Sequence, residues 1–237
     1  MSMPAPGRLE NISSASHDIS AILLLIVLYV FQGIPIGITS SVPILLQSSY
    51  RLGGYNLQAI FSIVFWPFGM KLLWAPIVDS VYIKFVGRRK TWLTIAQYSV
   101  AIVLLVLASR INDWFGRDPD KLWSPIGSHH PVNIIQLTIM FFVLTFAIAT
   151  QDIAVDGWAL TMLTKKNIGW VSTCNKVGQG LGFALAFVPL VCLESPDIPN
   201  KYFRRTPIED QGLITFSGFL YATGFSFMMV NTIVMDI

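Results

Sequence analysis

The sequence predicts an all-α protein, a polytopic bundle of transmembrane helices. Apolar residue types make up 54% of the 237 residues and charged types only 12%, whereas soluble domains carry about 25% charged residues. The mean hydropathy is +0.62, and the apolar residues gather in stretches near the roughly 20 residues that a helix needs to cross a bilayer. The formal charge of +3 is too small and dispersed to follow nucleic-acid phosphates. We therefore expect lipid as a partner and no nucleic acid.

Six apolar stretches joined by polar loops define the domain organisation. Residues 1–18 are polar, and we expect them to form a disordered cytoplasmic tail ahead of a six-helix transmembrane domain over 19–237. The expected spans are 19–46, 57–78, 92–109, 132–163, 168–193 and 213–235. The fourth stretch is long enough to project past the membrane.

Two pairs of glycines indicate where helices pack closely. Gly33 and Gly37 in the first stretch, and Gly178 and Gly182 in the fifth, each have the small-xxx-small spacing that lets two helix backbones approach each other. The run from Gly178 to Gly182 is not a dinucleotide-binding fingerprint, because no strand precedes it and the spacing differs.

Prolines interrupt the first two stretches. Pro35 lies in the first, and Pro67 and Pro76 lie in the second. Proline bends or breaks a helix because it lacks the backbone N–H. Bent helices are frequent around transporter binding sites, but they also occur as plain packing features.

Four ionisable side chains fall inside the predicted spans, namely Lys71, Asp152, Asp156 and Lys176. Such groups are costly in a membrane and usually face a cavity or a partner. Asp152 and Asp156 are one turn apart on one helix face, and we expect Asp156 to pair with Lys176. The pairing is open to two interpretations, a structural or gating charge pair and a direct contact with substrate or protons.

The fifth stretch carries a polar stripe at spacings of three and four, which should line a water-filled path. The stripe comprises Ser172, Asn175, Lys176 and Gln179. The candidate residues of the substrate path are Gln32, Lys71, Gln151, Asp152, Asp156, Asn175, Lys176 and Gln179. We expect no catalytic, metal or cofactor site, because no zinc spacing occurs and the histidines lie in polar tails or loops.

The connection after the second stretch has the features of a gate. Asp79 ends that stretch, and Gly87, Arg88 and Arg89 open the next, which permits a charge lock at the membrane face. A plain basic anchor is the alternative. Lys and Arg divide evenly between the two sides of the predicted bundle, but they are densest in the short loops on the side of the N-terminus. The positive-inside rule then favours a cytoplasmic N-terminus.

An Asp followed by Gly-Arg-Arg resembles the signature loop of the major facilitator superfamily, with residues 80–86 as a longer spacer than is usual. The longer form is similar to one branch, shared by bacterial muropeptide permeases and acetyl-coenzyme A transporters. The stretches that carry the resemblance to the acetyl-coenzyme A transporters are 29–35, 65–68, 71–76, 149–163 and 172–175.

The resemblance implies the N-terminal, six-helix half of a carrier with two such halves. It implies transport of acetyl-CoA by alternating access, from the cytosol into the lumen of the endoplasmic reticulum, for acetylation reactions there. The resemblance allows the carrier to exchange acetyl-CoA for CoA. It also allows the chain to form a homodimer. Trp158 and Trp170 are candidates for stacking on the adenine, as Lys71 and Lys176 are for the phosphates. Two alternatives stay open: another anionic or glycan substrate, and a half-carrier that acts as a scaffold without transporting.

Overall fold

The computed structural model describes residues 6–49, 54–81, 88–121, 123–196, 198–206, 208 and 211–236. For 6–17, 48, 49, 54, 88–90 and 234–236 it describes the backbone alone. Within these ranges the secondary structure is helical, and no strand occurs. The long helices are α1 (Pro6–Ser49), α5 (Arg88–Trp114), α6 (Ile134–Met162), α7 (Trp170–Leu193) and α8 (Phe216–Asp236). The all-α, polytopic fold class is thereby confirmed.

The first helix begins earlier than expected. Its backbone is helical from Pro6, so the expectation of a disordered tail over 1–18 is corrected for residues 6–18. Proline is well tolerated at the first position of a helix. Extending an existing helix adds one hydrogen bond per residue without a new nucleation step, and no proline falls between Pro6 and the apolar run.

The second predicted span, 57–78, is a chain of short helices rather than one helix. It consists of α2 (Gly54–Phe61), the 3-10 turn η1 (Ser62–Phe65), α3 (Trp66–Met70), the 3-10 turn η2 (Lys71–Leu73) and α4 (Ala75–Ser80). Pro67 and Pro76 each lie in the first turn of a new segment, α3 and α4, where a missing N–H leaves no bond unmade. Pro35, by contrast, lies inside the continuous helix α1.

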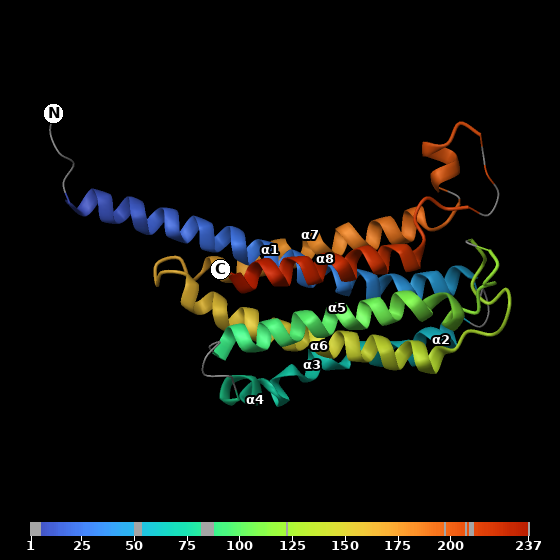
Figure 1. The fold of residues 1–237 in the computed structure, drawn as a ribbon, viewed down its shortest axis with the longest axis horizontal. Coiled ribbons are helices and arrows are strands. Elements are labelled where there is room, and N and C mark those ends of the chain that lie inside the picture. Colours follow the sequence, from blue (N-terminus) through green and yellow to red (C-terminus); the bar gives the residue numbers. More distant parts are fainter. Residues whose placement is uncertain are drawn as a thin grey trace.

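Successive segments run in opposite directions through the bundle. Figure 1 shows the end of α4, the start of α5, the α6–α7 turn and the end of α8 at one end of the molecule. The α5–α6 and α7–α8 connections, the latter with the π-helical turn η3 (Pro199–Phe203), lie at the other end. Asp18 ties α1 to the first end, because it accepts hydrogen bonds from Thr164 Oγ1 at 2.7 Å and Asn167 Nδ2 at 2.5 Å.

Five segments of the described chain are long and apolar enough to cross a membrane: 18–47, 55–73, 91–114, 134–162 and 170–193. They agree with five of the six predicted stretches to within a few residues. The sixth stretch forms α8, which carries Ser, Thr and Asn residues and falls outside this set. A crossing by α8 therefore stays a prediction.

Helices α1 and α7 pack against each other through the four glycines that the sequence singled out. A Cβ atom added at Gly33 or Gly182 would overlap a backbone oxygen of the opposite helix. At Gly37 and Gly178 it would stand 2.5 Å from Phe183 O and from Tyr29 Cβ, closer than real Cβ atoms approach. The prediction of close helix packing at both glycine pairs is therefore confirmed.

A buried ion pair joins the two connections at the far end. Arg117, at the beginning of the α5–α6 connection, pairs with Glu194, which follows α7. Both side chains are less than 10% exposed, and the guanidinium also lies 5.3 Å from the centre of the Phe115 ring. Two charges buried together in this way tie the α5–α6 connection to the end of α7.

Candidate functional site

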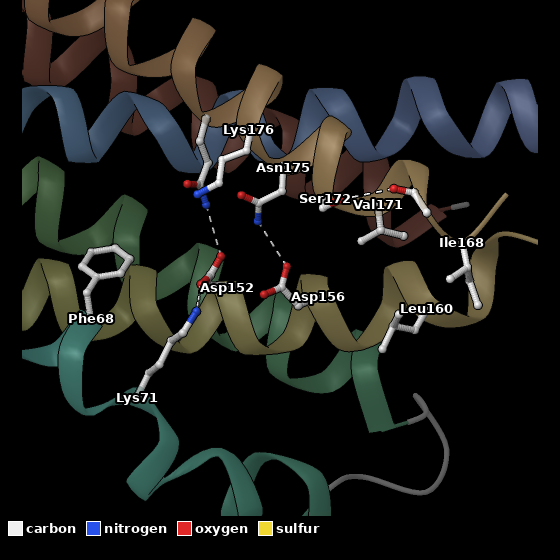
Figure 2. A pocket seen from close by; sticks show the side chains of 12 residues that line it. Phe68, Lys71, Asp152, Asp156, Leu160, Ile168, Val171, Ser172, Asn175 and Lys176 are labelled. Atoms are coloured by element: carbon white, nitrogen blue, oxygen red, sulfur yellow. Dashed lines mark hydrogen bonds and ion pairs between the residues drawn. The ribbon is translucent and has the colours of Figure 1, made fainter.

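The candidate site lies between α6, α7 and the broken second segment. Figure 2 shows Asp152 and Asp156 projecting from α6 towards α7, with Asn175 and Lys176 reaching back from α7 and Lys71 approaching from η2. The i, i+4 spacing on α6 places both carboxylates on the same face.

Asp152 is the centre of this arrangement. It forms an ion pair with Lys71 and accepts hydrogen bonds from Gln32 Nε2 at 2.5 Å and Gln179 Nε2 at 3.2 Å. The donors come from three elements, η2, α1 and α7. Asp152 is only 4% exposed, and a buried carboxylate needs such partners to offset its desolvation.

The break at η2 explains how Lys71 reaches this carboxylate. Lys71 is the first residue of the 3-10 turn η2, between α3 and α4. Its side chain remains 33% exposed while Asp152 is buried. The ion pair therefore has one buried partner and one that opens onto the site.

Asp156 has neutral partners where we expected a cation. It accepts hydrogen bonds from the Tyr29 hydroxyl at 2.7 Å and from Asn175 Nδ2 at 3.3 Å. The predicted Asp156–Lys176 pair is wrong: no ion pair of Lys176 occurs among the described residues. Neighbouring residues of a helix point about 100° apart, so Asn175 faces Asp156 and Lys176 projects past it.

Tyr29 is the site residue that the sequence analysis missed. It is fully buried and looks like one more apolar residue of the first stretch. Its spacing of three from Gln32 places both on one face of α1. That spacing is the feature of the sequence that could have identified Tyr29 as a site residue.

An open cavity of about 620 Å³ lies over these side chains. Six of the eight predicted path residues line it: Lys71, Asp152, Asp156, Asn175, Lys176 and Gln179. Ser172 of the polar stripe lines it as well, and the remaining lining is mainly apolar: Phe68, Leu160, Ile168, Gly169 and Val171. These charged and amide groups therefore meet in one cavity, and their role as a substrate path stays a prediction.

The other two predicted residues lie outside the lining. Gln32 is fully buried and holds Asp152 from behind the cavity. Gln151 is also fully buried, and neither its Oε1 nor its Nε2 has a hydrogen-bond partner among the described residues. The aromatic candidates Trp158 and Trp170 are likewise absent from the lining. Trp158 packs beside a buried apolar cluster, and Trp170 is exposed at the start of α7.

The predicted gating loop is only partly within the described structure. Asp79 is an exposed residue of α4. The backbones of Arg88 and Arg89 begin α5 at the same end of the bundle. Gly87 and the side chains of both arginines lie outside the described residues. The charge lock therefore stays a prediction.

The cavity presents charges of both signs together with amide groups. Lys71 is committed to Asp152, but the Lys176 ammonium is exposed and projects into the cavity without an ion pair among the described residues. An ammonium in a partly apolar cavity suits an anionic ligand group. The two carboxylates and three amide or hydroxyl side chains supply further polar contacts.

Comparisons with known proteins identify the family to which the chain belongs. The sequence model of the family described as Acetyl-coenzyme A transporter 1 matches residues 21–237. An uncharacterized membrane protein of Saccharomyces cerevisiae is 39% identical over 92% of this chain and 40% of its own length. An uncharacterized protein of Schizosaccharomyces pombe is 36% identical over 84% of this chain and 36% of its own.

A permease is also among the relatives. The anhydromuropeptide permease of Escherichia coli K12 is 27% identical over 70% of this chain and 30% of its own length. The chain thus spans 40% or less of the length of these three relatives. No solved structure matches the chain significantly. The family and the permease point to a membrane transporter rather than an enzyme.

Proposed function

Because the chain belongs to the acetyl-coenzyme A transporter 1 family, we propose that it acts in carrying acetyl-CoA from the cytosol into the lumen of the endoplasmic reticulum. The cargo would supply acetyl groups for luminal acetylation. The chain is a multi-pass membrane protein of a transporter family, and the cargo, the direction and the organelle are the proposed part. A cytoplasmic N-terminus belongs to the proposal, because the short basic loops lie on that side.

The observation that carries the proposal is the exposed ammonium of Lys176 inside the cavity. Acetyl-CoA carries several phosphate charges, and Lys176 offers a cation that no carboxylate of the described chain neutralises. Lys71 becomes a second cation if its pair with Asp152 opens. A carrier with a second six-helix half would close over such a site near the middle of the membrane.

Uptake of radiolabelled acetyl-CoA into proteoliposomes tests the proposal. The 237-residue chain and the full-length Saccharomyces cerevisiae relative are compared, with CoA trapped inside in a parallel series to test exchange. We expect Lys176→Gln, made at the matching position of whichever chain transports, to raise KM about ten-fold, as loss of a hydrogen bond to a charged group predicts. Lys201→Gln is the control, because Lys201 lies exposed in η3 at the opposite end. Failure of both chains to take up acetyl-CoA would reject this cargo.

A second substrate class is favoured by the similarity to the muropeptide permease. An anionic glycopeptide would use the same ammonium and the same amide groups. Competition in the uptake assay distinguishes the two, since only a carrier of that class is inhibited by anhydromuropeptide. If the full-length relative transports and the 237-residue chain does not, the chain is a scaffold or a half-carrier that needs a second copy. Its mass in detergent then shows whether it forms a homodimer.

A further inference from the structure

A series of buried residues at spacings of three and four runs along each of α5 and α6, and one position in each series is a glutamine. The two helices are antiparallel neighbours, and Asn133 N donates to Trp114 O at 2.9 Å where they join. From that turn, each helix presents fully buried residues at alternating spacings of three and four. Counting along both helices from that hydrogen bond gives their register, which matches Ile111 with Leu137, Leu107 with Phe141, Leu104 with Leu144, Val100 with Ile148, and Leu93 with Val155.

The same register places Gln97 opposite Gln151. Both are 0% exposed. Their layer coincides with a division of the protein interior: Val100 and Ile148 belong to one buried apolar cluster, and Leu93 and Val155 to the other. The two glutamines therefore interrupt a continuous apolar contact deep in the bundle.

Two more carboxamides join this level from neighbouring helices. Gln32 of α1 is fully buried and reaches Asp152, which follows Gln151 in the chain. Asn231 of α8 is 1% exposed and approaches Thr94 O at 3.5 Å, one turn from Gln97 on α5. We call these four side chains the polar layer: Gln32, Gln97, Gln151 and Asn231.

The unpartnered atoms of the polar layer are complementary. Among the described residues, no hydrogen-bond partner is present for the oxygens Gln32 Oε1, Gln97 Oε1, Gln151 Oε1 and Asn231 Oδ1, nor for the Nε2 groups of Gln97 and Gln151. The four side chains thus hold two amide donor groups and four amide acceptors without partners. Buried polar groups in native proteins are almost always paired, and the terminal torsion of a glutamine side chain is soft.

We propose that the polar layer closes into a carboxamide network that positions Asp152. Amide hydrogens of Gln97 and Gln151 are donated to Gln32 Oε1 and Asn231 Oδ1. When Gln32 Oε1 accepts a hydrogen bond from the polar layer, the Nε2 of the same amide group points the other way, towards Asp152. This is the orientation in which Gln32 can donate to Asp152. The opposite orientation would set an amide oxygen against a carboxylate. Gln97, Gln151 and Asn231 are therefore positioning residues for the carboxylate, and they act through Gln32.

A double-mutant cycle on thermal melting in detergent tests the network. Gln32→Met and Gln151→Met keep the side-chain shape and remove the amide, and the double variant completes the cycle. We expect the double variant to melt about 2–4 °C above the additive expectation, because removal of either amide already breaks the network. Thr138→Val is the matched control: Thr138 lies on α6, is 7% exposed and also has an unpartnered buried oxygen. Its effect should add to that of Gln32→Met.

Additivity of Gln32→Met with Gln151→Met would overturn the proposal. If Gln151→Met does not yield folded protein, Gln97→Met replaces it in the same cycle, with the same two outcomes. A transport assay gives a second measurement, which rests on the proposed function. Gln151→Met should lower the transport rate several-fold, whereas Thr138→Val should leave it unchanged. Coupling in melting without any transport would reject the proposed function and leave the network standing.

Discussion

Two ion pairs of the described chain join a buried carboxylate to a Lys or Arg side chain. They differ in the exposed fraction of the paired side chains. Arg117–Glu194 has both side chains below 10% exposure and lies at the far end of the bundle, between two connections. Lys71–Asp152 buries the carboxylate but leaves the lysine 33% exposed in an open cavity. The first pair is built to stay closed, because opening it would strand two buried charges. The second can open, because Lys71 can turn to solvent or to a ligand and Asp152 keeps two amide donors.

The largest effect is expected from breaking the far-end pair. Glu194→Gln leaves the buried Arg117 cation facing a neutral amide, and removing one partner of a buried pair costs about 3–5 kcal/mol. Thermal unfolding in detergent measures this loss. Asp120→Asn, an exposed acid of the α5–α6 connection, is the control and should melt like the parent. An unchanged melting temperature for Glu194→Gln would show that this pair is not a lock.

A smaller effect is expected at the α1–α7 contact, which holds Gln32 and Gln179 on two sides of Asp152. Gly182→Ala places a methyl group on the backbone of Val30, and overpacking of this kind costs about 1–3 kcal/mol. Gly180→Ala is the matched control on the same helix, because no atom of another helix lies within 4 Å of its Cβ position. Melting temperatures of the two variants give the difference. Equal values would mean that the glycine contact does not set the distance between α1 and α7.

The smallest stability effect is expected at the cavity pair. Lys71→Met should cost only about 1–2 kcal/mol, because the charged hydrogen bond that it removes is partly exposed to solvent. Its effect on transport should be much larger, with little uptake remaining in proteoliposomes. Lys176→Met removes a lysine that has no ion pair among the described residues, and it should leave the melting temperature unchanged. A stability loss at Lys71 as large as at Glu194 would erase the distinction between the two pairs.

Local patterns were sufficient for the packing of α1 on α7 and for the breaks in the second segment. Gly178 and Gly182 act through the absence of a side chain, so their spacing alone indicates a close helix contact. Pro67 and Pro76 lack an N–H and lie in the first turns of α3 and α4, whereas Pro35 lies inside the continuous helix α1. The apolar stretches and their alternating directions follow from length and hydropathy, and the polar stripe of α7 faces the cavity as its spacing predicts.

Partner choice was decided by the tertiary structure. The sequence shows two acids and two lysines inside apolar stretches, but either of the two complete pairings neutralises all four charges equally well. The break at η2 brings Lys71 to Asp152, although 81 residues separate them, and the rotation of α7 turns Asn175 rather than Lys176 towards Asp156. In the sequence, Arg117 and Glu194 cannot be distinguished from exposed charged residues of loops. Only the folded structure buries them together. A residue type states which interactions are available, but the free energy of a charge depends on what surrounds it, and only the packed helices supply those surroundings.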